Sequence, residues 1–167
     1  TSGCNLRCEW NGTRCDTPYT SWEARTQLLT VSQVCGQVLA LRQRYPQVQH
    51  AVVTGGEPLL QAALPALLTA LRREGLFVTL ETNGTLFMEV AADFVSLSPK
   101  LRSSTPRDGR LAAQHSQFRH RPEMLREWFD RHTCQFKFVI QQPDDEAEID
   151  ALLAELARPV AAESIYL

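Results

Sequence analysis

The sequence lacks the features that mark several large classes of protein. No apolar run approaches the roughly 20 residues of a membrane-spanning helix, and the N-terminus does not have the pattern of a signal peptide. The net charge is only −2, and the basic residues are scattered among acidic ones instead of forming a patch. We therefore expect neither insertion into a membrane nor a nucleic-acid partner.

The chain also lacks an initiator methionine and begins at Thr1, directly before a group of cysteines. At the other end, residues 164–167 have the pattern of a buried strand with nothing after it. We therefore expect this chain to be the middle of a longer protein, truncated at both ends. Its 167 residues, 44% of them hydrophobic, can bury one sizeable core, which predicts a single domain over 1–167.

A fourth metal ligand is missing near the clustered cysteines. Three residues separate Cys4 from Cys8, and six separate Cys8 from Cys15. A structural zinc site needs four protein ligands, whereas an iron–sulfur cluster held by three thiolates leaves one iron open for another molecule. The spacing alone leaves two interpretations: a non-catalytic zinc-loop binding module, or a cluster-binding loop over residues 1–22.

The remaining cysteines and the histidines are expected to be structural. Five cysteines, an odd number gathered towards one end, do not indicate a disulfide framework, and a reduced cytoplasmic compartment fits them. Cys35 falls inside a predicted helix, where we expect a small buried thiol. The histidines lie at element ends or in a polar segment and are expected at the surface: His50, His115, His120 and His132.

Hydrophobic periodicity predicts an alternation of strands and helices. Strands are expected at 51–53, 77–80, 94–97, 136–140 and 164–167. Helices are expected from an N-cap at Thr30 or Ser32 to about Tyr45, and at 59–73, 86–92, 123–132 and 144–157. Residues 101–120 are polar and aperiodic, which predicts a functional loop or insertion. The alternation is typical of the α/β class, with a parallel sheet covered by helices.

Three polar motifs directly follow predicted strands, at residues 54–57, 81–84 and 98–100. Because the carboxyl ends of parallel strands meet at one edge of the sheet, and ligands bind there, these motifs predict one shared site. The double glycine at 55–56 would let backbone approach a ligand, and the Glu57 carboxylate could accept a hydrogen bond from a ligand ammonium.

Each motif alone also has a plainer interpretation. Residues 54–57 could form an ordinary strand–helix turn, Asn83-Gly84 is first of all a turn signal, and Lys100 could be an exposed turn lysine. Lys137 lies between two phenylalanines in a predicted strand, and its side chain could point inward at the site or outward to solvent.

Taken together, the motifs resemble the radical S-adenosylmethionine (SAM) enzymes, and among them the 7-carboxy-7-deazaguanine synthase family. The resemblance covers almost the whole chain. Its motifs are Cys4-Asn-Leu-Arg-Cys8, Cys15-Asp-Thr17, Thr54-Gly-Gly-Glu-Pro-Leu59, Glu81-Thr-Asn-Gly84 and Ser98-Pro-Lys100. It implies an incomplete (β/α) TIM-type barrel. One departure is the spacing: the common pattern has two residues before the third cysteine, so 9–14 resembles an insertion containing an Asn-Gly turn.

The resemblance also implies a role for individual residues. Cys4, Cys8 and Cys15 would hold a 4Fe-4S cluster whose fourth iron binds SAM. The amino end of SAM would be taken by Gly56 with Glu57, and other parts of SAM by Ser98, Pro99 and Lys100. Thr54 would contact the substrate, and Thr17 would ligate a Mg2+ ion that holds the substrate carboxylate.

The implied reaction converts 6-carboxy-5,6,7,8-tetrahydropterin to 7-carboxy-7-deazaguanine with release of ammonia, in queuosine and 7-deazapurine biosynthesis. The cluster would deliver the electron that cleaves SAM, and the hard chemistry would belong to the cofactor. The implied partners are the small pterin substrate, an electron donor such as flavodoxin or ferredoxin, and a second copy of the chain in a homodimer. An alternative within the superfamily is an activating enzyme that generates a glycyl radical on a protein partner.

Overall fold

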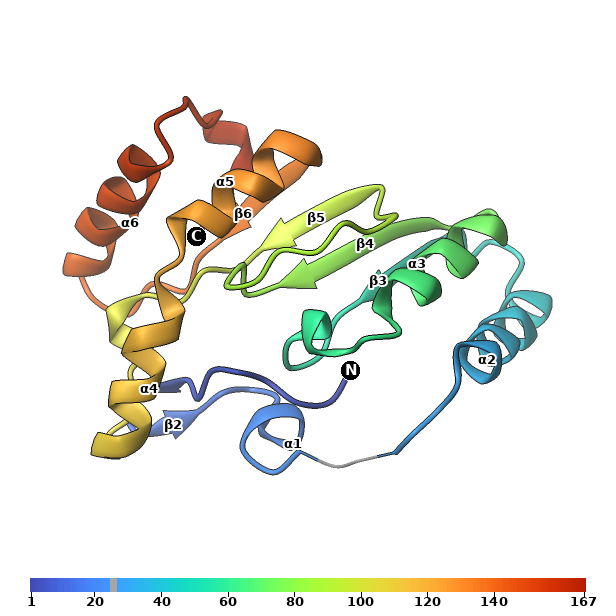
Figure 1. Ribbon diagram of the computed structural model, residues 1–167, viewed down its shortest axis with the longest axis horizontal. Coiled ribbons are helices and arrows are strands. Elements are labelled where there is room, and N and C mark those ends of the chain that lie inside the picture. Colours follow the sequence, from blue (N-terminus) through green and yellow to red (C-terminus); the bar gives the residue numbers. More distant parts are fainter. Residues whose placement is uncertain (25–26) are drawn as a thin grey trace.

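A five-stranded parallel sheet forms the centre of the computed structural model, which describes residues 1–24 and 27–167 (Figure 1). The strands are β3 (His50–Val53), β4 (Phe77–Thr82), β5 (Phe94–Leu97), β6 (Cys134–Lys137) and β7 (Ile165–Tyr166). They lie in the order β3-β4-β5-β6-β7, and every neighbouring pair is parallel. The predicted α/β class is therefore confirmed. Within the described residues β3 and β7 do not pair, so the sheet is open, as an incomplete barrel requires.

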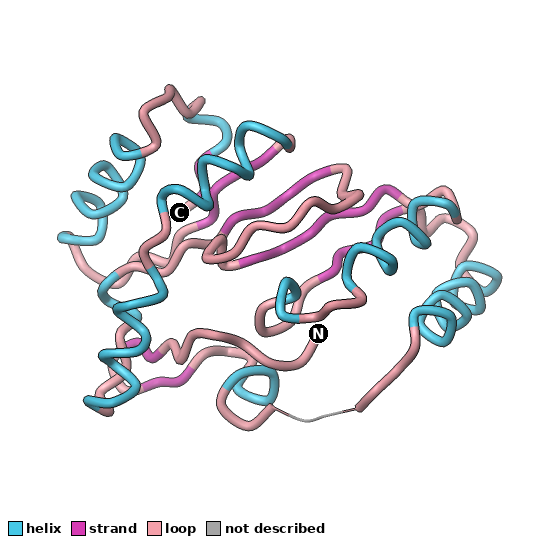
Figure 2. Tube along the Cα trace, viewed as in Figure 1, coloured by secondary structure: helices cyan, strands magenta, loops and turns pink. Residues whose placement is uncertain are grey.

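Helices precede β3 and lie in the connections β3–β4, β5–β6 and β6–β7, whereas β4 and β5 are joined without a helix (Figures 1 and 2). They are α2 (Val31–Arg44), α3 (Leu64–Arg73), α4 (Gly109–Arg119), α5 (Pro122–Arg131) and α6 (Asp144–Glu155). The predicted N-cap Thr30 is confirmed, because its side chain accepts from Gln33 N while the Gln33 side chain accepts from Thr30 N. No helix in the described residues combines the length and the apolar character needed to cross a membrane.

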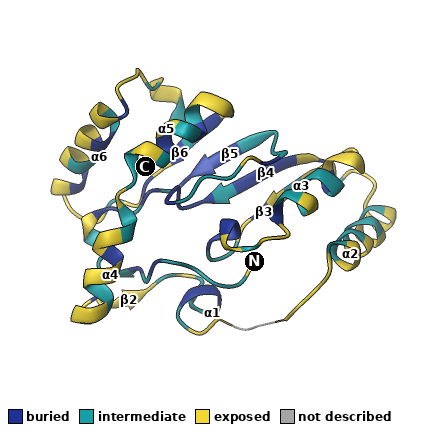
Figure 3. Ribbon diagram, in the orientation of Figure 1, coloured by how far each residue is buried: buried dark blue, intermediate teal, exposed yellow. Residues whose placement is uncertain are grey.

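The two faces of the sheet carry different side chains. On the helix side, Val78, Val95 and Phe136 are fully buried and pack against residues of α3 and α5, including Leu68 and Trp128. This layer appears as the dark strands and inner helix faces of Figure 3. The opposite face carries polar side chains at alternating positions: Glu81, Ser96 and Lys137. Period-two alternation therefore gives each strand one core face and one polar face.

The segment expected to be a long polar loop is folded. Residues 101–120 contain a 3-10 turn, η2 (Arg102–Ser104), and helix α4, whose N-cap Asp108 accepts from Leu111 N at 2.9 Å. The prediction of a loop was wrong because α4 buries only His115, so the segment has no apolar period. His115 is 1% exposed and bonds to Ser104 Oγ at 3.0 Å, which also corrects its expected place at the surface.

Other helices and strands have boundaries that differ from those predicted from the sequence. The helix expected at 59–73 begins as a 3-10 turn, η1 (Pro58–Leu60), before α3, and no helix forms at 86–92. There the carbonyl of Leu86 accepts from the Trp128 indole at 2.8 Å, so a tertiary bond takes the place of a helical one. The strand expected at 136–140 ends at Lys137, and the end of the chain is not a buried strand, since Leu167 is 75% exposed.

Candidate active site

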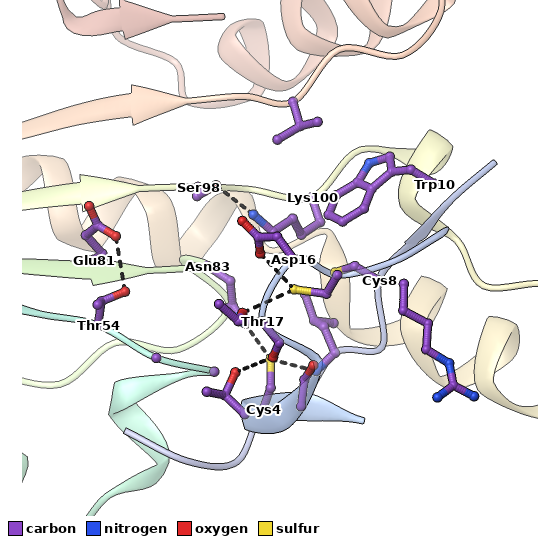
Figure 4. A pocket seen from close by; sticks show the side chains of 18 of the residues that line it. Cys4, Cys8, Trp10, Asp16, Thr17, Thr54, Glu81, Asn83, Ser98 and Lys100 are labelled. Atoms are coloured by element: carbon purple, nitrogen blue, oxygen red, sulfur yellow. Dashed lines mark hydrogen bonds between the residues drawn. The ribbon is translucent and has the colours of Figure 1, made fainter. Parts of the chain in front are cut away.

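A cavity of about 780 Å³ lies at the carboxyl ends of the strands, between the sheet and the cysteine loop (Figure 4). The loop supplies Cys4, Cys8, Cys15 and Thr17 to the cavity wall, and the three motifs after the strands supply Thr54, Gly56, Asn83, Ser98 and Lys100. The prediction that residues 54–57, 81–84 and 98–100 share one site is therefore correct for the placement of the motifs.

Residues 1–22, expected to be a loop, contain a short hairpin and one helical turn: β1 (Glu9–Trp10), β2 (Thr13–Arg14) and α1 (Pro18–Ser21). The hairpin turns at Asn11 and Gly12, both of which have positive φ values, 51° and 84°. Two such residues between antiparallel strands form the turn that Asn-Gly favours. The six residues between Cys8 and Cys15 therefore form a hairpin that brings Cys15 back beside Cys8. The backbone N–H of Cys15 donates to the Cys8 carbonyl at 3.1 Å.

Three cysteine thiols of the loop offer sulfur ligands on one cavity wall. Cys4, Cys8 and Cys15 are free and line one cavity. Among residues 1–24 and 27–167, no three His, Cys, Asp or Glu side chains converge closely enough to hold one metal ion. Thiolate sulfur is the ligand that holds iron–sulfur clusters in proteins. Burial raises the pKa of the Cys8 thiol to about 12, so a positive centre is needed to keep this sulfur as a thiolate.

The double glycine makes room for the chain's own backbone. A Cβ at Gly55 would lie 2.0 Å from Thr1 O, and one at Gly56 would lie 2.1 Å from Gly3 O. The two segments are joined by hydrogen bonds, from Gly56 N to Thr1 O at 3.1 Å and from Glu57 N to Gly3 O at 2.8 Å. The glycines thus allow the cysteine loop to pack onto the end of β3, and both still line the cavity.

Glu57 is not placed as the sequence suggested. Its carboxylate is 0% exposed, does not line the cavity, and accepts from Leu59 N, Thr82 Oγ1 and Asn83 N at 2.8–3.1 Å. Burial raises its pKa, while these three hydrogen bonds act in the opposite direction. The side chain is thus unavailable to a ligand ammonium. It ties the turn after β3 to the turn after β4.

The third motif, residues 98–100, is held in place by a hydrogen bond from the 101–120 segment, which was expected to be a loop. Lys100 Nζ donates to Ser98 Oγ at 2.6 Å, and both residues line the cavity, whereas Pro99 is buried and does not. Arg119 of α4 donates to Lys100 O at 3.3 Å and pairs with Glu148 of α6 at 2.5 Å. The 101–120 segment therefore holds the backbone of Lys100.

Polar groups on the cavity wall complete the site. Thr54 Oγ1 donates to Glu81 Oε2 at 3.1 Å. Thr17 Oγ1 is hydrogen-bonded to Cys15 Sγ at 3.4 Å, and its side chain does not cap α1. Lys137 also lines the cavity, which decides between its two predicted orientations in favour of the inward one.

Several cavity residues were not identified as site residues from the sequence. They are Trp10, Asn11, Asp16, Ser96, Val139 and Gln141. A period-two pattern could have indicated Ser96 and Val139, since each lies two residues from another cavity residue, Ser98 and Lys137 respectively. The hairpin residues could not be found this way, because their position depends on a tertiary hydrogen bond from Asn11 Nδ2 to Gln141 Oε1 at 3.1 Å.

Known proteins resemble this chain in sequence and fold. It is 41% identical over 163 residues to a 7-carboxy-7-deazaguanine synthase of Halobacterium salinarum, covering 93% of this chain and 60% of the relative. It is 39% identical over 171 residues to one of Rhodopirellula baltica, covering 100% of this chain and 62% of the relative. The chain thus spans about three fifths of the length of these relatives.

Solved structures share the fold. QueE from Escherichia coli superposes with a TM-score of 0.56 at 23% identity, covering 98% of this chain and 69% of that one. Streptococcus suis SuiB bound to S-adenosylmethionine superposes with a TM-score of 0.61 at 13% identity, covering 98% of this chain and 40% of that one.

A family sequence model matches a longer part of the chain than any single motif covers. The sequence model of the Radical SAM superfamily matches residues 1–102, the part of the chain that contains the cysteine loop and all three motifs of the cavity wall. With three free thiols on one cavity, a parallel sheet behind them and this match over most of its length, the chain belongs to the radical SAM superfamily.

Proposed function

We propose that this chain is the core of a radical SAM enzyme that converts 6-carboxy-5,6,7,8-tetrahydropterin to 7-carboxy-7-deazaguanine with release of ammonia, in queuosine biosynthesis. The observation that carries the proposal is the 41% and 39% identity to 7-carboxy-7-deazaguanine synthases over nearly the whole chain. The cavity of about 780 Å³ is large enough for SAM and a pterin-sized substrate together.

Cys4, Cys8 and Cys15 would hold the 4Fe-4S cluster, since they are the free thiols that line the cavity. When bound, the cluster supplies the electron that cleaves SAM and so starts radical chemistry on the substrate. The surrounding chain supplies orientation and shields the reaction from water. The buried Cys8 and the hairpin wall that carries Trp10 support this second role.

SAM would lie between the cysteine loop and the ends of β3 and β5. Gly56 has no side chain and lines the cavity, so its backbone is accessible to the amino end of SAM. Glu57 contributes there through its backbone and its structural hydrogen bonds, since its carboxylate is buried. Ser98 and Lys100 offer a hydroxyl and a cation suited to ribose or carboxylate oxygens, and Pro99 keeps their turn rigid.

Mg2+ would bind at Thr17 and hold the carboxylate of the substrate. The Thr17 hydroxyl faces the cavity, and the exposed Asp16 carboxylate lines the cavity beside it. Hard oxygen ligands of this kind are those that Mg2+ prefers, with water and substrate filling the other positions. Thr54, held to Glu81 by its hydroxyl, would contact the substrate on the far side of the same cavity.

The remaining features of the proposal concern partners and compartment. A homodimer is supported by α2, which buries none of its residues and leaves Leu41 50% exposed. The electron would come from a small redox protein such as flavodoxin or ferredoxin. Five free cysteines support a reduced cytoplasmic compartment.

One incubation tests the central claim. Full-length protein, reconstituted anaerobically with iron and sulfide, is mixed with 6-carboxytetrahydropterin, SAM, Mg2+ and a chemical reductant. Mass spectrometry should detect 7-carboxy-7-deazaguanine and 5′-deoxyadenosine. A protein that binds iron and cleaves SAM but leaves the pterin intact would refute the proposed substrate, and a colourless protein that retains no iron would refute the cluster.

A further inference from the structure

Asn83 lies at the meeting point of the cysteine loop and the turn after β4. It is 6% exposed, and its backbone N–H donates to the buried carboxylate of Glu57 at 2.8 Å. Its side-chain nitrogen Nδ2 lies 2.9 Å from Asn5 Oδ1 and 3.9 Å from Cys4 Sγ. No other side chain in the described residues donates a hydrogen bond to Cys4 Sγ, and the second donor is the backbone N–H of Leu6 at 3.4 Å.

The orientation of this amide is fixed by its neighbours. Thr85 N, which can only donate, lies 3.0 Å from Asn83 Oδ1, so the oxygen must face Thr85 and the nitrogen must face Cys4. The Thr85 hydroxyl also donates to Asn83 Oδ1 at 2.7 Å and accepts from Asn5 Nδ2 at 2.7 Å. The three side chains form a closed ring of donors and acceptors, while the Thr85 backbone N–H fixes the amide orientation that turns one N–H of Asn83 towards the sulfur.

A donor aimed at a ligand sulfur changes the chemistry of an iron–sulfur cluster. Hydrogen bonds to the sulfurs are among the factors that set the reduction potential, because they stabilise the more negative, reduced state. The distance from Asn83 to Cys4 is long for nitrogen and oxygen but within reach of the larger, polarisable sulfur. The effect is expected to strengthen once Cys4 is a thiolate, because a charged acceptor makes the stronger hydrogen bond.

We propose that Asn83 is a positioning residue that acts through Cys4: its side-chain N–H raises the reduction potential of the bound cluster, and the backbone N–H of Thr85 keeps it aimed. The inference rests on the cluster assignment within the proposed function but not on the identity of the substrate. It gives the Glu81–Gly84 motif a role in electron delivery to SAM.

The test is an anaerobic redox titration of full-length, reconstituted protein, followed by electron paramagnetic resonance and by iron content per chain. Asn83→Ala removes the donor and should lower the reduction equilibrium constant three- to tenfold, where tenfold corresponds to about 59 mV for one electron. The matched control is Thr85→Val, which breaks the same ring but leaves Thr85 N and the amide orientation in place. It should stay within twofold of the wild type.

If Asn83→Ala does not fold, a second pair of variants tests the same inference. Asn83→Asp keeps the acceptor for Thr85 N but replaces the donor with a negative charge, and Asn5→Asp adds the same charge nearby while keeping the Asn83 donor. Asn83→Asp should lower the potential more than Asn5→Asp does.

Equal shifts in these two variants, or an Asn83→Ala potential no lower than that of Thr85→Val, would overturn the inference. A wild-type protein that binds no iron would instead contradict the cluster itself, so the two failures are distinguishable.

Discussion

The backbone N–H of Cys15 donates to the carbonyl of Cys8 at 3.1 Å, so the two residues face each other across the open end of the β1–β2 hairpin. The six residues between them therefore do not separate the two sulfur-bearing positions, because the hairpin brings the chain back. A longer sequence spacing between second and third cysteine is thus compatible with one shared cluster, provided that the hairpin turn forms.

The turn residue Gly12 should therefore control cluster binding. It has φ of 84°, and a Cβ there would lie 3.0 Å from the Arg107 guanidinium, so Gly12→Ala should cost about 1 kcal/mol and reduce iron retained per chain. Melting temperature and iron content measure the two effects. Gly109→Ala is the control, since a Cβ at Gly109 meets nothing and its φ is not positive. Equal iron content in both variants would show that the hairpin does not position Cys15.

Cys8→Ala should abolish the cluster, because Cys8 is buried and lines the cavity together with the other two thiols of the loop. The brown colour and absorbance near ~400 nm should be lost. Cys35→Ala is the matched cysteine control: Cys35 lies on α2, only partly buried against the hydrophobic core, and its removal should leave the iron content unchanged. A similar loss of iron in both variants would contradict the assignment of three ligands.

Thr17→Ala should spare SAM cleavage but weaken the magnesium dependence of turnover. The Thr17 side chain makes no capping bond to α1, so its loss should change the melting temperature little. Turnover measured against Mg2+ concentration should require several-fold more metal, and Thr17→Ser, which keeps the hydroxyl, should restore the wild-type curve. An unchanged magnesium response in Thr17→Ala would remove Thr17 as a metal ligand.

Much of the fold could be predicted from the sequence. The parts that could not be predicted share one physical cause. The five strands and the motifs after them depend on local apolar runs, so their existence was predictable. The roles of Glu57 and His115 depend on their burial in the folded protein. Burying a polar side chain costs free energy, and hydrogen bonds to specific partners must offset that cost. Neither residue lies in an apolar pattern, and their partners Asn83 and Ser104 are not recognisable as such from spacing. Helix α4 was not predicted because its one buried residue is His115, so its sequence shows no apolar period.

Glu57→Gln should destabilise the protein by about 2–3 kcal/mol, because the new amide NH2 would face N–H and O–H donors in a fully buried site. The three donors to this carboxylate come from Leu59, Thr82 and Asn83. Urea unfolding measures the change. Glu74→Gln, at the exposed end of α3, should be neutral within 0.5 kcal/mol, roughly the usual range for surface substitutions. Comparable stability of Glu57→Gln and wild type would mean that water reaches this carboxylate.

His115 should make the protein sensitive to mild acid. Burial, with Arg119 and Lys100 nearby, lowers the pKa of His115 from 6.5 to about 4 in the folded protein. Because a histidine in the unfolded chain takes up its proton near pH 6.5, protons favour the unfolded state between these two values. Stability should therefore fall as the pH drops from 6.5 towards 4, by up to about 1.4 kcal/mol per pH unit, and this contribution should level off below 4.

Urea unfolding at several pH values measures this slope, and His115→Gln should flatten it because glutamine does not titrate. His120→Gln is the matched histidine control, because His120 lies at the surface, with its side chain 41% exposed and paired with Glu155. A wild-type slope retained in His115→Gln would mean that another group carries the acid sensitivity. A flattened slope would identify His115, which is hydrogen-bonded to Ser104 Oγ, as the group that carries the acid sensitivity.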